Sequence, residues 1–340
     1  MTDRPKKAVS VHLVAMVRGR RRKTLRLCLM IGYFGPEGTF THQALLTLGE
    51  QDGWRDFIDP TDVKPYATVQ RALDAVREGE VEASLVPIEN SVEGGVSATL
   101  DYLARPGADQ LQIKAEVVIA VEFELVARPG TTLDQVKTII THPHAAAQCR
   151  DWVAENVPGA VIVEKGSTAA AALEVSNPDS EFDAAISAAV ARDLYGLVSL
   201  ASGISDNEAA ETRFILATRA GKPTERTGAD KTTLVAFMRV DRSGALLEIL
   251  QQFAVRGVNL CRIESRPTKT MLGSYCFSID AEGHISDLRL AETLQGLKRV
   301  CKDVIYLGSY ARADKQPPIV PRGQTDDDYA DSADWFSKLS

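Results

Sequence analysis

Small polar side chains recur in this sequence where short apolar runs end. Four turns of this kind are Gly35-Pro-Glu-Gly-Thr-Phe-Thr, Glu89-Asn-Ser, Thr141-His-Pro-His and Gly166-Ser-Thr. Each apolar run is typical of a buried strand, and in open α/β sheets ligands bind at the carboxyl ends of the strands. Helix N-termini at that edge offer backbone N–H groups to anions. The pattern therefore predicts a cleft of hydrogen-bond donors that suits an anionic ligand.

The same side chains also have structural interpretations. Ser and Thr at such turns serve as helix N-caps, and Ser167 or Thr168 can cap a helix and bind a ligand at once. His142 and His144 suggest a metal site, but two histidines without a nearby third ligand are a weak signal. Pro143 is simply explained as the first residue of a helix. We therefore expect no metal site.

The turns lie in a repeated strand–turn–helix order, which predicts an α/β fold with a parallel or mixed sheet. Strands are expected at 30–34, 83–88, 112–125, 138–141, 161–163 and 184–187, and helices at 39–48, 69–78, 96–103, 145–155, 169–175 and 188–195. A linker follows at 220–230. Beyond it, the strands expected at 231–240, 258–265, 274–280 and 304–310 and the helices at 245–255 and 288–300 form a βαββαβ order. That order is the ferredoxin-like pattern.

Several longer motifs resemble those of prephenate dehydratases in order and spacing. They include the turns above, Pro87-Ile-Glu-Asn-Ser-Val-Glu-Gly-Gly-Val, Gln148-Cys, Gly166-Ser-Thr-Ala and Thr212-Arg-Phe. Gly244-Ala-Leu-Leu and Glu264-Ser-Arg-Pro are similar to the effector motifs of that family's ACT domain. The resemblance covers roughly residues 30–310. It implies a two-lobed catalytic unit like the periplasmic binding proteins, followed by a ferredoxin-like ACT domain.

The resemblance implies dehydration and decarboxylation of prephenate to phenylpyruvate in phenylalanine biosynthesis, with phenylalanine as the feedback effector. It implies no cofactor. Because the enzyme must hold two carboxylates and help a hydroxyl to leave, aimed hydrogen-bond donors suit the reaction. Two alternatives stay open: an arogenate dehydratase, and a non-catalytic binding protein that senses amino acids.

The family's motifs also assign roles to residues. Thr212 is the expected catalytic residue and would hydrogen-bond the leaving hydroxyl. The expected substrate-binding residues are Thr39, Asn90, Ser91, Thr141, Gln148, Ser167, Thr168, Arg213 and Phe214. Arg213 either pairs with a substrate carboxylate or forms a salt bridge with an internal acid, and Phe214 is interpreted chiefly as a packing residue.

The expected effector-binding residues lie in the ACT domain: Gly244, Ala245, Leu246, Leu247, Asn259, Leu260, Glu264, Ser265, Arg266 and Pro267. Gly244 would let the backbone approach a ligand, or would merely form the strand–helix turn. ACT domains usually bind effectors between subunits, so the resemblance implies a homodimer or homotetramer.

Composition sets the remaining expectations. The chain has 340 residues and a formal net charge of −7, which does not favour nucleic acid as a partner. Its five cysteines form no CxxC pair, which favours reduced thiols in the cytoplasm. No apolar run is long enough to cross a membrane. We expect a basic, disordered extension at 1–29, a catalytic unit at 30–219 with lobes 30–108 plus 196–219 and 109–195, an ACT domain at 231–310, and a disordered acidic tail at 311–340.

Overall fold

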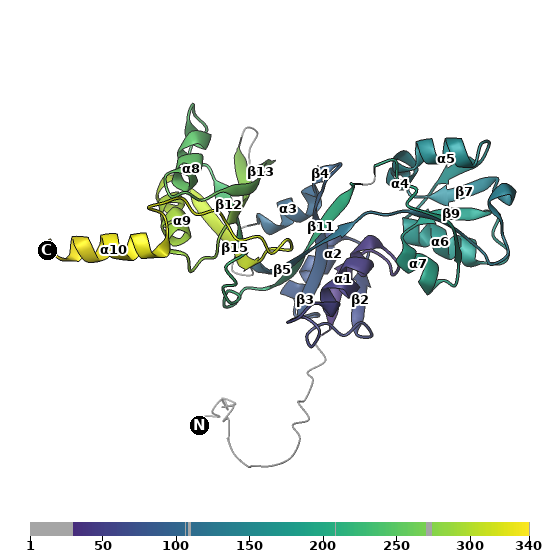
Figure 1. Cartoon of the computed structure of the whole chain (residues 1–340), viewed down its shortest axis with the longest axis horizontal. Coiled ribbons are helices and arrows are strands. Elements are labelled where there is room, and N and C mark those ends of the chain that lie inside the picture. Colours follow the sequence, from purple (N-terminus) through teal and green to yellow (C-terminus); the bar gives the residue numbers. More distant parts are fainter. Residues whose placement is uncertain (1–29, 106, 108–109, 208, 270–273, 340) are drawn as a thin grey trace, which may run out of the picture.

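The computed structural model describes residues 30–105, 107, 110–207, 209–269 and 274–339. The expected basic extension at 1–29 lies outside these residues. Three α/β units follow one another in a row, with the catalytic lobes at the middle and right and the ACT unit at the left of Figure 1. Among the described residues, no helix is long and apolar enough to cross a membrane.

The first lobe is built on a mixed sheet in the order β2-β1-β3-β11-β5, and β4 pairs with β3. Its strands are β1 (Ile31–Phe34), β2 (Val63–Tyr66), β3 (Ala83–Asn90), β4 (Gly94–Gly95), β5 (Leu111–Ala120) and β11 (Glu211–Arg219). Strands β1, β2 and β3 are parallel, whereas β11 runs antiparallel to both of its neighbours, β3 and β5. The last strand is thus inserted into the middle of the sheet.

Helices cover this sheet on both faces. They are α1 (Phe40–Glu50), α2 (Val69–Arg77) and α3 (Ser97–Leu103). Helix α2 buries Val69, Ala72, Leu73 and Val76, the i, i+3, i+4, i+7 spacing of a single helical face. Helix α1 packs with Phe214 and Leu216 of β11 on one face of the sheet, and α2 and α3 pack with Ile215 and Ala217 on the other.

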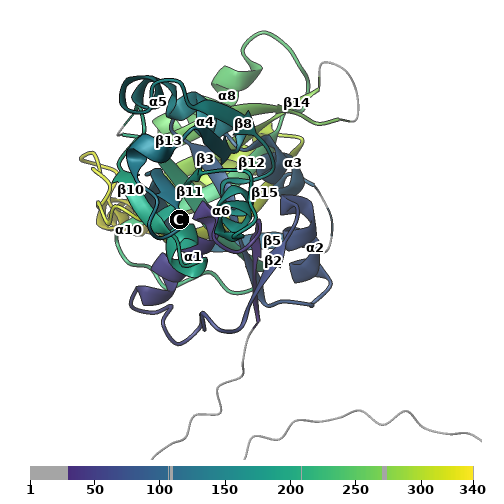
Figure 2. The ribbon, with the colours of Figure 1, turned by 90° about the vertical axis from the view of Figure 1, so that its right-hand side faces the viewer.

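The second lobe has a sheet in the order β10-β6-β9-β7-β8. Its strands are β6 (Glu124–Ala127), β7 (Thr138–Thr141), β8 (Val161–Glu164), β9 (Ala184–Ser187) and β10 (Val198–Ser202). Its helices are η1 (Leu133–Gln135), α4 (Pro143–Gln148), α5 (Arg150–Asn156), α6 (Thr168–Ser176) and α7 (Ala189–Leu194). Figure 2 views the molecule from the end at which this lobe lies.

Strand pairing places the boundaries of the lobes differently from the sequence expectation. The apolar run at 112–125 belongs to two strands, because β5 joins the first sheet and β6 joins the second. The stretch at 196–202 contains β10, which also belongs to the second sheet. The chain therefore crosses between the lobes near 121–123 and returns near 203–210. Hydrophobic periodicity identifies a strand but not the sheet in which it pairs, which explains the difference.

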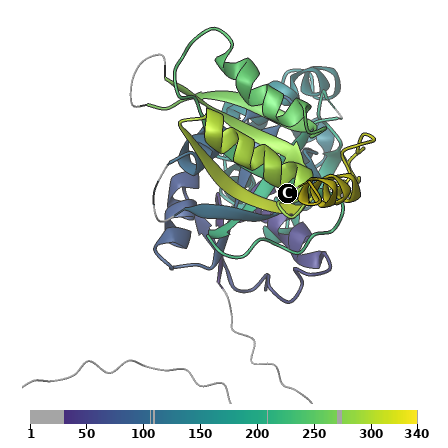
Figure 3. The same cartoon turned by 90° about the vertical axis from the view of Figure 1, so that its left-hand side faces the viewer.

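The third unit is an antiparallel sheet in the order β13-β14-β12-β15, which confirms the ferredoxin-like prediction. Its strands are β12 (Asp230–Phe237), β13 (Leu260–Pro267), β14 (Tyr275–Glu282) and β15 (Asp303–Ala311). Its helices are α8 (Ala245–Ala254) and α9 (Leu288–Val300). In Figure 3 these two helices cover the outer face of the sheet.

The inner face of the ACT sheet packs directly on the first catalytic sheet. One hydrophobic cluster contains Ile113 and Ile215 of the catalytic lobe together with Val235, Ile305 and Leu307 of the ACT unit. Because a single core spans both units, the ACT unit is an integral part of the first lobe rather than a module held on a free linker.

The acidic tail also differs from expectation, because its described part is ordered. Helix α10 (Asp326–Ser337) begins at a capping box in which Thr325 and Asp328 bond each other's backbone N–H groups. Asp326 accepts a hydrogen bond from the backbone N–H of Leu288, at the start of α9. The composition of the tail indicated disorder. The three acids in the first turn instead stabilise the helix, because they lie at the positive end of its dipole.

A substitution at Gly308 tests how closely the ACT sheet packs on the first catalytic sheet. Its φ is +136°, and a Cβ at this position would clash with the carbonyl oxygen of Ile113 in β5. Replacing Gly308 with alanine should lower the free energy of unfolding by about 2–4 kcal/mol, through overpacking and backbone strain. Urea unfolding measures the loss.

Gly130→Ala is the matched control, because its φ is +92° and nothing lies within 4 Å of the added Cβ. We expect a loss of only about 1 kcal/mol there. Equal losses in the two variants would contradict close packing between the ACT sheet and β5.

Candidate active site and effector site

The side chains of Thr212 and Asn90 meet on neighbouring strands of the first sheet. Thr212 of β11 lies opposite Asn90, the last residue of β3. The Asn90 Nδ2 group donates a hydrogen bond of 2.8 Å to Thr212 Oγ1, while Asn90 Oδ1 accepts from the backbone N–H groups of Val92 and Glu93. Since Asn90 donates to the hydroxyl oxygen, the single hydroxyl hydrogen of Thr212 is available to another acceptor.

Ser91 joins the same two strand ends. Its backbone N–H donates to the carbonyl oxygen of Glu211 at 2.9 Å, and its hydroxyl oxygen accepts from the Glu211 N–H at 2.9 Å. These bonds fix the residue that precedes Thr212. Ser91 is thus placed beside the expected catalytic residue, where it holds the backbone of β11.

Two expected cleft residues of the second lobe make local structural bonds, and a third begins a helix. Thr141 is buried at the end of β7, and its hydroxyl donates to the carbonyl oxygen of Ile186 at 2.8 Å. Ser167 is the N-cap of α6, where its Oγ accepts from the N–H of Ala170, and Thr168 is the first residue of that helix. Ser167 is therefore the N-cap that the structural interpretation predicted, whereas Thr141 bonds to the neighbouring strand β9 and caps no helix.

Gln148 ends α4 and differs from these residues. Its backbone carbonyl accepts from the N–H of Asp206 at 2.7 Å, but its buried side-chain Oε1 has no hydrogen-bond partner among the described residues. An unpaired buried amide oxygen is costly. Gln148 therefore keeps the capacity to bind a ligand.

The two lobes touch at the loop that contains Thr39. Gly38 lies against Ala169 of α6 and Ala191 of α7, so a Cβ at position 38 would come within 3.3 Å of both. The Tyr195 hydroxyl donates to the carbonyl oxygen of Glu37 at 3.2 Å. Thr39 is the N-cap residue of α1, and its hydroxyl donates to Pro36. The loop therefore brings Thr39 to the boundary between the lobes.

A second contact between the lobes involves the histidine motif. His144 of α4 bonds to Glu93, which follows β3 in the first lobe. His142 caps α4 by accepting from the His144 N–H at 3.3 Å, and burial, followed by the nearby His144, lowers the pKa of its imidazole. No group of three or more His, Cys, Asp or Glu side chains suited to a metal occurs in the described part of the chain.

Arg213 points away from the cleft. Successive side chains of a strand face opposite sides of the sheet, so Thr212 and Phe214 share one face while Arg213 faces the ACT unit. Phe214 is buried in the core beside α1, as its packing interpretation predicted. Arg213 is 7% exposed and bonds to Glu116 at 2.6 Å and to Asp280 at 2.5 Å. Of the two roles left open for Arg213, the structure favours the internal salt bridge over substrate binding.

Arg213 is the centre of a buried ion cluster between the two sheets. The other members are Glu89, Glu116, Lys231, Arg262, Asp280 and Tyr310. Asp280 of β14 is fully buried and also accepts from Arg262 and from the hydroxyl of Thr233. Burial alone would raise the pKa of the Asp280 carboxyl, but the guanidinium groups of Arg213 and Arg262 outweigh it and hold that pKa far below its usual value.

The expected effector residues fall into two groups. Gly244, Ala245, Leu246, Leu247 and Ser265 line one pocket of about 500 Å³. Gly244, with a φ of +84°, is the N-cap residue of α8. The pocket is open to solvent on one side, where Leu247 is 57% exposed.

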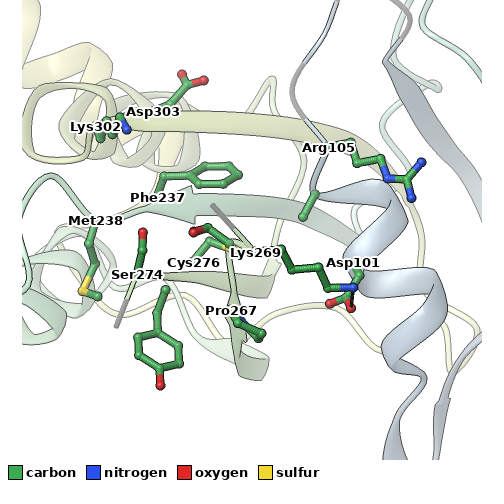
Figure 4. Close-up of a pocket in the computed structure, with 13 residues that line it drawn as sticks. Asp101, Arg105, Phe237, Met238, Pro267, Lys269, Ser274, Cys276, Lys302 and Asp303 are labelled. Carbon is green, nitrogen blue, oxygen red and sulfur yellow. Dashed lines mark ion pairs between the residues drawn. The ribbon is translucent and has the colours of Figure 1, made fainter. Parts of the chain in front are cut away.

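The remaining effector residues lie away from this pocket. Arg266 and Glu264 face the catalytic unit, where Arg266 Nε bonds to Asp101 of α3 at 2.9 Å. Pro267 lines a different pocket, of about 320 Å³, between α3 and the ACT sheet (Figure 4). Asn259 and Leu260 line neither pocket, and the carbonyl oxygen of Asn259 accepts from Glu282.

Sequence reasoning allowed a salt bridge between Arg213 and an internal acid, but it missed the rest of the ion cluster and the pocket between α3 and the ACT sheet. Glu116, Lys231 and Asp280 are charged residues within strands that are largely buried, and charged residues are rarely buried unless they are paired. Nothing in the sequence, however, pairs residues that are 67 and 97 positions from Arg213.

Taken together, the fold and the sites define a two-lobed α/β enzyme like the periplasmic binding proteins, with a ferredoxin-like ACT domain. The chain belongs to the prephenate dehydratase family. The prephenate dehydratase family model matches residues 31–222. A prephenate dehydratase of Amycolatopsis methanolica is 45% identical over 311 residues, which are 91% of this chain and 97% of that protein.

Two solved structures resemble this chain over most of its length, and the first agrees with this assignment. The prephenate dehydratase of Arthrobacter aurescens in complex with L-Phe is 48% identical, with a TM-score of 0.83 over 92% of this chain and 99% of that chain. GqqA, described as a novel type of quorum quenching acylase, is 30% identical, with a TM-score of 0.73 over 84% of this chain and 100% of that chain.

The pKa of Asp280 makes a prediction about acid stability. A carboxyl whose pKa is depressed by folding stabilises the protein above its unfolded pKa, about 3.9, and loses that contribution as the pH falls toward the folded pKa. We compare the protein with Asp280→Asn, which cannot titrate. The gap in free energy of unfolding between the two should be constant above about pH 5 and should narrow below about pH 4. Urea unfolding between pH 3 and 8 measures the gap, and a constant gap would contradict the depressed pKa.

Proposed function

We propose that this enzyme converts prephenate into phenylpyruvate, carbon dioxide and water in phenylalanine biosynthesis, with Thr212 as the catalytic residue. The observation that carries the proposal is the Asn90–Thr212 hydrogen bond at the strand ends, in a chain of this family. Family relatives along most of the chain's length support the same activity.

The geometry of Thr212 suits departure of the ring hydroxyl. As the ring carboxylate leaves as carbon dioxide, its bonding electrons complete the aromatic ring and the hydroxyl departs with its electron pair. The departing oxygen, which takes one proton to become water, carries the developing negative charge. A donor aimed at that oxygen stabilises the transition state. Asn90 occupies an acceptor site of Thr212 Oγ1, so the hydroxyl hydrogen of Thr212 is free for this role.

We assign substrate binding to residues of both lobes. Ser91 follows the end of β3, Thr39 lies at the boundary between the lobes, and Gln148 ends α4. The unpaired Gln148 Oε1 can accept from the substrate hydroxyl. Thr141, Ser167 and Thr168 hold the facing edge of the second lobe, where the N-terminus of α6 attracts a carboxylate. The proposal needs no cofactor and no metal.

Phenylalanine is proposed as the effector, bound at the Gly244–Leu247 pocket. The backbone at the start of α8 and Ser265 would bind the ammonium and carboxylate groups, and the apolar wall formed with Met238 and Phe277 would bury the ring. The exposed Leu246 and Leu247 at the pocket leave room for a second subunit to close it. We therefore propose a homodimer or homotetramer in which the pocket lies between ACT domains.

The cytoplasm is the proposed location. Cys149, Cys261, Cys276 and Cys301 are all free thiols, and all but Cys261 are buried. Reduced thiols of this kind are typical of cytoplasmic proteins. Arogenate remains the alternative substrate, and incubation with prephenate and arogenate side by side, followed by product analysis, distinguishes the two.

Thr212→Ala tests the catalytic assignment. Loss of one aimed donor should lower kcat on the order of a hundredfold or more, while thermal unfolding changes little. Phenylpyruvate is measured by its absorbance in base. Thr218→Ala, near the opposite end of β11, is the matched control and should retain full turnover. A folded Thr212→Ala protein with near-normal turnover would rule out this role for Thr212.

Gly244→Val tests the effector assignment. A branched side chain at φ +84° strains the start of α8 and crowds the pocket, so inhibition by L-Phe should be lost while kcat without L-Phe is largely retained. Calorimetry measures L-Phe binding directly. Gly53→Val, at φ +90° in an open loop of the first lobe, controls for backbone strain and should keep L-Phe inhibition. Unchanged inhibition in Gly244→Val would place the effector elsewhere.

A further inference from the structure

The residue next to Thr212 in the chain is held by the ACT domain. Arg213 bonds through Nη1 to Asp280 at 2.5 Å, through Nη2 to the Tyr310 hydroxyl at 2.8 Å and through Nε to Glu116 at 2.6 Å. Asp280 and Tyr310 belong to the ACT strands β14 and β15. We propose that Asp280 is a positioning residue for catalysis, which acts through Arg213 to fix the Thr212 hydroxyl in the cleft.

The argument begins with the geometry of β11. Thr212 and Arg213 project from adjacent residues to opposite faces of the sheet. A guanidinium group that is bonded on three sides and 7% exposed cannot rotate to another position without breaking charged hydrogen bonds. Any rotation or shift of the backbone that re-aims Thr212 would therefore also move Arg213 out of its bonds.

Strand pairing restrains this part of β11 more firmly on one side than on the other. The pairing of β11 with β5 is regular from Glu211 to Leu216, whereas its pairing with β3 shifts register between Arg213 and Phe214. The two residues before this irregularity are Thr212 and Arg213. Because the ladder with β3 is interrupted there, the ion cluster adds a restraint to the one that the ladder with β5 provides.

The proposal rests on the proposed function and adds a route for its regulation. The ACT sheet carries the effector pocket on the side of Ser265 and Phe277, and Asp280 on the side that faces β11. A movement of this sheet relative to the first lobe would displace Asp280, and with it Arg213 and Thr212. A displacement of about 1 Å in a catalytic group is enough to reduce a rate on the order of a hundredfold.

Asp280→Asn is the principal test. This substitution keeps the shape of the side chain but replaces its ion pair with Arg213 by a weaker, uncharged contact. The value of kcat for prephenate should therefore fall at least tenfold, while KM changes less than threefold. Asp101→Asn is the matched control, because Asp101 forms ion pairs between the first lobe and the ACT unit, with Arg266 and Lys269, away from Arg213. That variant loosens the same interface without touching β11, and its kcat should stay within twofold of the parent value.

A double variant separates positioning from general damage. In the Thr212→Ala background there is no hydroxyl left to aim, so adding Asp280→Asn should lower the residual rate less than twofold. If Asp280 only maintained the fold, the two losses would multiply. Multiplied losses, or a folded Asp280→Asn enzyme with unchanged kcat, would overturn the proposal.

If Asp280→Asn does not fold, Tyr310→Phe tests whether the contacts of Arg213 with the ACT domain position Thr212. It removes one hydrogen bond to Arg213 without changing the charge of the cluster. The value of kcat should fall severalfold in the enzyme that has Thr212 and should not fall in the Thr212→Ala background. Tyr306→Phe is its control, because the Tyr306 hydroxyl bonds to Ser309. Equal kcat in the two Tyr→Phe variants would overturn the proposal. A parent protein that forms no phenylpyruvate would instead refute the proposed function, so the two failures are distinguishable.

Discussion

The guanidinium group of Arg213, buried between two sheets, is the interaction on which the arrangement of the domains depends. A charge removed from water is tolerated only where opposite charges and hydrogen bonds surround it. Here one acid comes from β5 of the catalytic lobe and another from β14 of the ACT domain. Neither sheet could bury its part of this cluster alone. The cluster therefore specifies how the two sheets dock, and the apolar residues around it provide the contact area.

The same constraint explains why the catalytic and ACT units share one core. Ferredoxin-like domains often leave one face of the sheet open, and in this protein that face carries Lys231, Arg262 and Asp280. In an isolated domain these charges would be solvated, whereas Val235, Ile305 and Leu307 beside them would be left exposed. Docking on β5 buries the apolar side chains and pairs the charged ones in one step.

Sequence reasoning anticipated the strands and helices whose patterns are local. The turn at Gly35, the N-cap at Ser167 and the βαββαβ order of the ACT domain are set by neighbours within a few residues, and the structure contains them. Pairing between distant segments was not readable in the same way. The split of 112–125 between two sheets and the partners of Arg213 depend on residues far away in the chain.

The helix at 326–337 was missed because composition outweighed its capping box. Of the candidate site, Asn90 and Thr212 were each expected in the cleft, but their contact joins residues 122 positions apart and could not be read from the sequence. Some of the expected effector residues line a pocket, whereas others contact α3, and this division could be seen only in the packed structure.

The place of β11 in the first sheet has a consequence for how the protein assembles during synthesis. Strand β11 lies between β3 and β5 and is bonded to both, yet it follows the whole second lobe in the chain. A chain that leaves the ribosome from its N-terminus must complete β6 to β10 before the gap between β3 and β5 can be filled. One of the acids that hold Arg213, Asp280, is made later still, in β14. The cleft therefore acquires its threonine only after the whole second lobe has been made, so a chain that ends before β11 lacks the means to act on the substrate.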